Sequence, residues 1–431
     1  MMRAQLADSH RLFKLWGTVQ RVLPGMVRIT GVSHAAGISN EVRIETASGD
    51  VYGEILSVDP GQVTAQLYAA EESIRIGDKA FIEPSGEVEI GDHWLGQIID
   101  YRGRPAEASV SGQAEGQTRL LKADAPPAPL RRGLGARLAT GLMVTDTLLP
   151  LCRGQRMGLF AGSGVGKSTL LGKLAAGVEA DRLVIALVGE RSREVTAFLH
   201  KLTPEVRRKA VIVAATASEP AGAKKRAALC AMAAAEHFRD QGHHVLLLFD
   251  SLTRFAEAHR ETALSAGEAP ALNAFPPSTV RVLAELVERA GPGTASQGDI
   301  TAIFSVLVAG SDTEEPLADM VRGILDGHIV LSRDIAERGR YPAIDVLRSI
   351  SRSLPDAATA EENTLLTEFR RLIAAYENIL PMLRADLYEP GKDPETDRAI
   401  ALFQKLDTFT GAANPELAEQ AFTALDSTLK S

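Results

Sequence analysis

A glycine-rich segment near residue 165 constrains the fold of this chain more than any other feature. Residues 161–168 read AGSGVGKS, follow an apolar run at 157–160 and precede a helix-forming stretch at 169–177. This order of strand, glycine loop and helix is typical of a phosphate-binding P-loop. Glycines let backbone N–H groups turn toward a phosphate, and the helix N-terminus adds partial positive charge. The sequence therefore predicts an α/β nucleotide-binding domain.

The residues of the loop have separate predicted roles. Lys167 is expected to reach the β- and γ-phosphates of ATP, and the hydroxyl of Ser168 to bind Mg²⁺. The alternative is a glycine turn without a ligand, but the flanking strand and helix favour the phosphate site. The residues expected to contact nucleotide are Gly162, Ser163, Gly164, Val165, Gly166, Lys167, Ser168 and Thr169. ATP and Mg²⁺ are the predicted cofactors.

Two acidic residues stand where apolar runs end. Asp250 follows the run 245–249 and Glu190 follows the run 183–188. A lone Asp in this position is often a helix cap, but a P-loop protein needs an acid near its metal, so Asp250 is a candidate Mg²⁺ ligand. A carboxylate beside the γ-phosphate can orient and polarise the attacking water, which makes Glu190 the candidate base. The alternative for Glu190 is a surface ion pair.

Changes in the residue pattern along the sequence divide the chain into domains. Short alternating stretches, separated by turn residues about every 8–12 positions, predict an N-terminal β-barrel over 1–100. The polar, proline-bearing stretch 101–132 is interpreted as a linker. Over 133–358, apolar strands alternate with helical stretches, which indicates a mostly parallel sheet covered on both faces. Residues 359–431 predict a C-terminal helical domain.

Charge and cysteine content exclude several classes of protein. With 47 Lys and Arg against 55 Asp and Glu, the net charge of −8 argues against a general nucleic-acid binder. Two cysteines, Cys152 and Cys230, cannot form a disulfide framework and are expected to be buried thiols. The longest apolar run, 300–310, is about half of what a membrane span needs, and the N-terminus does not resemble a signal peptide. A cytoplasmic protein is expected.

Several motifs together resemble the ATPases of type III protein export, especially the flagellar export ATPase. They read GLFAGSGVGKSTLL, VGERSREV, LLLFDSLTRFAEAHRE and GRYPAIDVLRSISR. The resemblance is dense over 157–352, weaker in 1–100 and weakest after about 360. That family is similar to the catalytic and regulatory subunits of rotary F-type ATPases. The resemblance implies a RecA-like nucleotide domain between a β-barrel and a helical domain.

The same resemblance implies roles for individual residues. Glu190 is similar to the catalytic carboxylate, Arg191 to a basic residue that touches the γ-phosphate, and Asp250 to the Walker B acid. Tyr341 is similar to the aromatic residue that lies against adenine, and Arg352 to the arginine finger that enters the neighbouring subunit's site. The alternatives are a core aromatic for Tyr341 and an intrachain salt bridge for Arg352.

The pairing of Glu190 with Arg352 in one chain predicts an assembly. In the rotary relatives these two roles lie on different subunit types, which argues against a subunit of a proton-driven ATP synthase. Identical subunits that each carry both residues can complete one another's sites in a ring. The predicted function is therefore Mg-dependent ATP hydrolysis by a homohexamer that energises the export of flagellar proteins.

Two other functions stay open: a virulence-type (injectisome) secretion ATPase, and a ring-shaped RNA translocase, against which the charge and low aromatic content count. The resemblance implies as partners a stator-like regulatory subunit, a central stalk-like subunit, a membrane export gate, export substrates and chaperones. It implies no nucleic-acid partner, and a cytoplasmic location at the periphery of the inner-membrane export apparatus. The basic, amphipathic residues 1–16 are either a lead-in to the first strand or a docking segment for a partner and acidic lipid.

Overall fold

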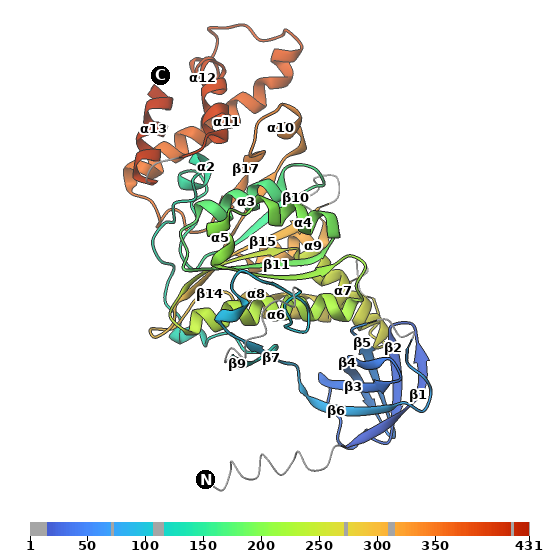
Figure 1. Cartoon of the computed structure of the whole chain (residues 1–431). Coiled ribbons are helices and arrows are strands. Elements are labelled where there is room, and N and C mark those ends of the chain that lie inside the picture. Colours follow the sequence, from blue (N-terminus) through green and yellow to red (C-terminus); the bar gives the residue numbers. More distant parts are fainter. Residues whose placement is uncertain are drawn as a thin grey trace.

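The computed structural model describes residues 15–69, 73–106, 116–270, 275–308, 315–414 and 418–430. Three regions follow one another along the molecule: a β-barrel, a mostly parallel sheet between helices, and a group of C-terminal helices (Figure 1). This arrangement confirms the predicted fold class. The hypothesis of an N-terminal docking segment concerns residues 1–16, and residues 1–14 lie outside the described ones.

The N-terminal region is a closed antiparallel barrel with the strand order β1-β2-β5-β4-β3-β6. Alternate residues, such as Val27 and Ile29 of β2, point into the barrel and are fully buried. Their side chains fill its interior, as is usual in small barrels. The strands are β1 (Trp16–Leu23), β2 (Met26–Thr30), β3 (Asn40–Thr46), β4 (Gly49–Asp59), β5 (Gln62–Leu67) and β6 (Lys79–Ser85).

The stretch after the barrel is more structured than a plain linker. β7 (Glu87–Ile90) pairs antiparallel with β9 (Gln117–Leu120), which lies inside the predicted linker. β8 (Ile98–Ile99) pairs parallel with β12 at the edge of the central sheet. Two short 3-10 helices, η1 (Asp92–Trp94) and η2 (Ala128–Leu130), complete this part.

The central sheet has the strand order β17-β16-β10-β15-β13-β11-β12-β8. Only β17 against β16 and β14 against β15 are antiparallel among its described pairings. The parallel strands are continuous apolar runs because helices cover both faces of the sheet. The strands are β10 (Arg156–Ala161), β11 (Arg182–Glu190), β12 (Ala210–Thr216), β13 (His244–Asp250), β14 (Gly291–Pro292), β15 (Asp299–Leu307), β16 (Gly327–Leu331) and β17 (Ile344–Ser351).

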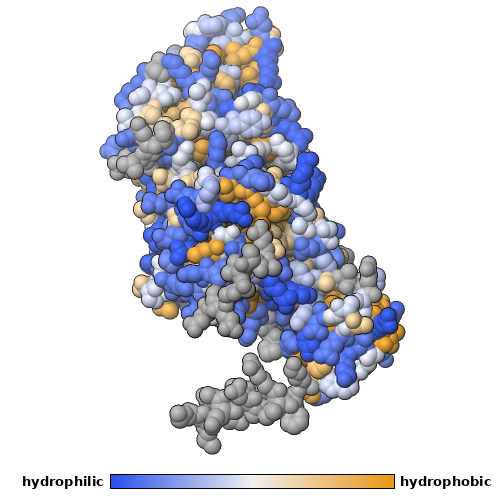
Figure 2. Space-filling view, viewed as in Figure 1, coloured by the Kyte–Doolittle hydropathy of each residue, from blue (hydrophilic) through white to orange (hydrophobic). Residues whose placement is uncertain are grey.

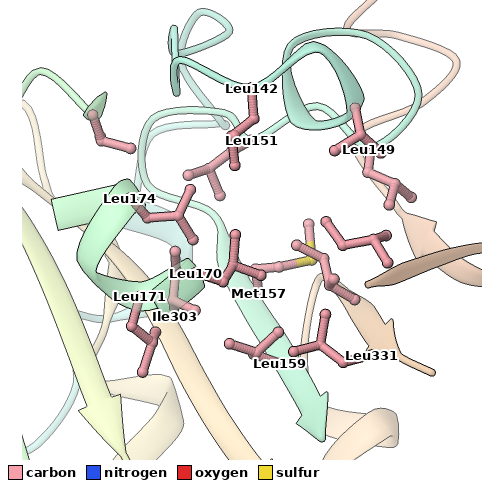
Figure 3. Close-up of a cluster of buried hydrophobic side chains, with 14 of the residues drawn as sticks. Leu142, Leu149, Leu151, Met157, Leu159, Leu170, Leu171, Leu174, Ile303 and Leu331 are labelled. Atoms are coloured by element: carbon pink, nitrogen blue, oxygen red, sulfur yellow. The ribbon is translucent and has the colours of Figure 1, made fainter. Parts of the chain in front are cut away.

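Helices α3 to α5 cover one face of the sheet, and α6 to α8 cover the other (Figure 1). On the first face, Met157 and Leu159 of β10 pack against Leu170 and Leu174 of α3 (Figure 3). On the second face the alanine-rich α6 is buried along most of its length. These helices and their neighbours are α2 (Met143–Asp146), α3 (Lys167–Gly177), α4 (Ser192–Lys201), α5 (Pro204–Arg208), α6 (Ala221–Asp240), α7 (Leu252–Ser265), α8 (Ser278–Glu288), α9 (Pro316–Ile324) and α10 (Arg333–Glu337).

The C-terminal region consists of α11 (Ala360–Arg384), α12 (Pro394–Gly411) and α13 (Ala418–Lys430). A capping box between Thr359 and Glu362 starts α11. Figure 2 shows a mainly hydrophilic face on which the apolar residues form separate patches. In the described part of the chain, no helix combines the length and the apolar character needed to cross a membrane.

Candidate active site

A cleft of about 770 Å³ opens where the parallel strands end, and its size is typical of a small-molecule site. The carboxyl ends of β10, β11, β13 and β15 meet at this edge, which is where ligands bind in open α/β sheets. Of the residues predicted to contact nucleotide, those lining the cleft are Gly162, Ser163, Gly164, Gly166, Lys167, Ser168 and Thr169. Val165 is buried in the core below the loop, so only its backbone can take part.

The loop after β10 needs glycine at two positions. Gly164 and Gly166 have φ angles of 79° and 94°, in the left-handed region that side chains disfavour. Gly166 is also the N-cap of α3, and no described side chain caps this helix. The first N–H groups of α3 and its positive dipole end therefore remain for an anion in the cleft.

Three of the predicted residues meet at the base of the cleft. The Lys167 ammonium forms an ion pair with Asp250 Oδ1 and lies 3.4 Å from Glu190 Oε1. The hydroxyl of Ser305 donates a hydrogen bond of 2.6 Å to the same Asp250 oxygen. The strands explain this meeting, because β11 and β13 are neighbours and both acids stand at their carboxyl ends.

Glu190 has an unusual electrostatic environment. Burial raises the pKa of Glu190 to about 7; the Lys167 ammonium opposes the rise and the Asp250 carboxylate adds to it. A carboxyl group with a pKa near neutrality suits a general base, because it can both accept and release a proton at working pH. The ion partner of Glu190 is Lys167 inside the cleft, whereas its neighbour Arg191 pairs with Glu194 at 3.3 Å.

The rim of the cleft holds charged residues. Arg191 is 80% exposed and lines the mouth. Sequence reasoning missed Arg254 and Glu257, which form a 2.8 Å ion pair and also line the cleft. The side chain of Arg254 packs on Gly189, which has a φ of 74°. The sequence held one signal for them: Arg254 and Glu257 are four and seven positions after Asp250, so they share one face of the helix that follows it.

Tyr341 and Arg352 lie at two different places. Tyr341 is 49% exposed, and its ring lies 3.3 Å from the position that a Cβ on Gly166 would occupy. It therefore faces the phosphate loop and is no core aromatic. Arg352 follows the edge strand β17, is exposed, and donates to the Arg322 carbonyl at 3.3 Å. It does not line this chain's own cleft.

The donor set at the cleft fits Mg²⁺. Ser168 supplies a hydroxyl and Asp250 a buried carboxylate, and hard oxygen ligands are the ones that Mg²⁺ prefers. Among the described residues no group of three or more His, Cys, Asp or Glu side chains forms a metal cage. This agrees with the chemistry of nucleotide sites, in which one or two protein groups and the phosphates share the cation.

Comparison with known proteins gives consistent matches. Residues 141–351 match the ATP synthase alpha/beta family, nucleotide-binding domain, and residues 358–414 match the T3SS EscN ATPase C-terminal domain. The flagellum-specific ATP synthase of Bacillus subtilis is 38% identical, with 98% of this chain and 96% of the relative covered. The SPI-2 type 3 secretion system ATPase of Salmonella typhimurium is 40% identical, with 86% of this chain and 88% of the relative covered.

Solved structures agree in fold. The assembled ATPase EscN from the type III secretion system of enteropathogenic E. coli matches with a TM-score of 0.89 and 36% identity, over 96% of this chain and 100% of that one. EscN in complex with its central stalk EscO matches with a TM-score of 0.87.

Proposed function

Since the chain belongs to the family of flagellum-specific and type III secretion ATPases, we propose that it couples Mg-dependent ATP hydrolysis to the export of flagellar proteins. The observation that carries the proposal is the meeting of Lys167, Glu190 and Asp250 beside the glycine loop. A nucleotide phosphate held by the loop lies next to both an ammonium group and a carboxyl group of raised pKa.

The loop and Lys167 bind the phosphates. The N–H groups at the start of α3 donate to phosphate oxygens, and the Lys167 ammonium neutralises charge on the β- and γ-phosphates. Ser168 and Asp250 would hold Mg²⁺, which would neutralise charge that develops on the phosphate oxygens. Ser305 keeps the Asp250 carboxylate in place by its hydrogen bond.

Glu190 acts on the attacking water. Its carboxylate accepts a proton as the water oxygen bonds to the γ-phosphorus and the bond to the β-phosphate oxygen breaks, which yields ADP and phosphate. Burial gives Glu190 the pKa of about 7 that this exchange needs. Arg191 at the mouth contributes positive charge toward the γ-phosphate.

The site is completed by a neighbouring subunit. Arg352 is exposed beyond an edge strand and away from its own cleft, a position from which it can enter the next copy's cleft. An arginine finger is worth on the order of 10³–10⁵ in rate. The assembled form of EscN supports a ring, and we propose a homohexamer.

The proposed partners follow the same relatives. The complex of EscN with its central stalk EscO supports a stalk-like partner for this chain. A stator-like regulatory subunit, an export gate, chaperones and export substrates, and a location at the cytoplasmic side of the inner membrane, belong to the proposal as well. Virulence-type export is the second candidate, because the Salmonella secretion ATPase is as similar as the flagellar relatives.

Phosphate release from ATP tests the enzymatic part. Lys167→Ala should reduce the rate by on the order of 10²-fold or more, because it removes the cation at the phosphates. Lys173→Ala is the matched control: Lys173 lies on the same helix, is exposed and does not line the cleft. It should change the rate less than about twofold. Full activity in the Lys167→Ala protein would refute the assigned site.

Secretion by the source cell tests the export part. A strain without this chain should lose flagellar proteins from the medium, and wild-type chain but not the Lys167→Ala chain should restore them. Loss of virulence effectors with flagellar export intact would support the second candidate instead.

A further inference from the structure

The loop that carries Tyr341 is held by a buried arginine. Arg340 stands in the segment between α10 and β17, and its side chain is only 11% exposed. Its guanidinium donates to the backbone carbonyls of Pro342 at 3.0 Å and Ile344 at 2.9 Å. These two bonds close the turn in which Tyr341 lies.

The same guanidinium connects the loop to the C-terminal helices. Arg340 Nε donates to Asp407 Oδ1 on α12 at 3.1 Å, and this carboxylate is 29% exposed. At the end of α12, the Cβ position of Gly411 lies 3.3 Å from the Arg340 side chain and 3.4 Å from the Tyr341 carbonyl oxygen. The fork geometry explains the residue type, since the planar guanidinium directs N–H groups from three different nitrogens at three separated acceptors.

The other side of Tyr341 faces the phosphate loop. Its ring atoms lie 3.3 Å from the Cβ position of Gly166, so ring and glycine are in close contact. A shift of the Tyr341 loop therefore changes the surface next to the start of α3. The contacts run from Gly166 through Tyr341 and Arg340 to Asp407.

We propose that Arg340 is a positioning residue for nucleotide binding, which holds Tyr341 beside the phosphate loop and ties ATP affinity to α12. The inference rests on the proposed function. Arg340 does not line the cleft, so it acts through Tyr341, which by resemblance lies against the base, and leaves the phosphate contacts to the loop.

Steady-state kinetics with two ligands test this role. Tripolyphosphate, as a competitive inhibitor, occupies the phosphate loop but has no base. Arg340→Ala should raise the KM for ATP about tenfold with kcat within about threefold, the loss expected for one base contact. The inhibition constant of tripolyphosphate should stay within about twofold, because its contacts do not involve Tyr341.

Variants on both sides of the contact separate positioning from folding. Asp407→Ala should raise the KM in the same direction, and the double variant should be no worse than Arg340→Ala alone, because both remove one link. If Arg340→Ala does not fold, Asp407→Ala carries the test. The matched control is Arg338→Ala: Arg338 stands two residues earlier and lies 6.0 Å from the Phe403 ring of α12, and its loss should leave the KM unchanged.

Two results would overturn the inference. One is an unchanged KM for ATP in folded Arg340→Ala and Asp407→Ala proteins. The other is an equal rise for ATP and tripolyphosphate, which would mean a general distortion of the cleft. Failure of the proposed function looks different, because the wild-type chain would then hydrolyse no ATP at all.

Discussion

The central sheet is joined to the C-terminal helices and to the barrel by interfaces of opposite chemistry. Phe369 of α11 and Leu406 of α12 belong to the same buried apolar cluster as Leu159 of β10. The barrel instead has a core of its own, and no residue of that cluster is shared with the sheet among the described residues. Ion pairs such as Glu41 with Arg226 connect the barrel to the sheet region.

The barrel interface centres on one carboxylate between two lysines. Glu54 accepts from Lys122 at 2.6 Å and lies 3.5 Å from Lys225 of α6. Burial would raise the pKa of Glu54, but the charges of Lys225 and Lys122 outweigh it and lower the pKa to about 2. A neutral hydrogen bond of 2.8 Å from Thr262 to Gln66 lies in the same interface.

The two interfaces differ in how their contacts are distributed. A shared apolar core packs the sheet and the C-terminal helices as one body. Charged pairs hold the barrel by a few directional contacts. We therefore expect the barrel contacts to respond more to pH and to single charge substitutions than the apolar core of the C-terminal helices does.

The largest effect is expected from the apolar interface. Phe369→Ala should lower the free energy of unfolding by about 4 kcal/mol, because the ring is fully buried and packs against Phe409. Urea unfolding measures it. Leu387→Ala is the control, since Leu387 is 68% exposed beyond α11 and should cost less than about 0.5 kcal/mol. Equal effects of the two would contradict a shared core.

The ionic interface should respond to acid. The pKa of Glu54 is lower in the folded chain than its ordinary value of 4.5, so its stabilisation is complete above pH 4.5 and is lost as the pH falls toward 2. At pH 7, Glu54→Gln should weaken the interface by about 3 kcal/mol. At pH 3 this effect should be smaller by about 2 kcal/mol.

Hydrogen exchange of the α6 backbone reports opening of this interface. Glu45→Gln serves as control. It removes an ion pair between the exposed Glu45 and Arg43, both on β3 of the barrel, and should have no measurable effect on α6. A pH-independent effect of Glu54→Gln would count against the ionic description.

The neutral hydrogen bond should matter least. Thr262→Val removes the bond to Gln66 and should cost about 1 kcal/mol in the same exchange experiment. Thr364→Val is the control, because Thr364 is exposed on α11 and its hydroxyl donates within its own helix, to the Ala360 carbonyl. A cost equal to that of Glu54→Gln would remove the distinction between charged and neutral contacts.

Motifs and apolar runs were enough to predict that Lys167, Glu190 and Asp250 stand beside strands, and their catalytic roles stay predictions. Lys167, Glu190 and Asp250 follow apolar strands that are parallel, so their meeting follows from topology. Sequence could not predict Ser305 or Arg340, because their partners lie 55 and 67 residues away and no local pattern fixes such contacts. The strand β9 was missed for the same reason, since its partner β7 precedes it by about thirty residues.

In the proposed ring, a neighbour's Arg352 completes each cleft. Lys167→Ala and Arg352→Ala chains, each nearly inactive alone, are mixed in equal amounts, and ATP hydrolysis is measured with the oligomer mass of the mixture. Random mixing leaves about a quarter of the interfaces with both residues intact, so about a quarter of wild-type activity should return. Confirmed co-assembly without any recovery would contradict an Arg352 that acts in the neighbouring subunit's cleft.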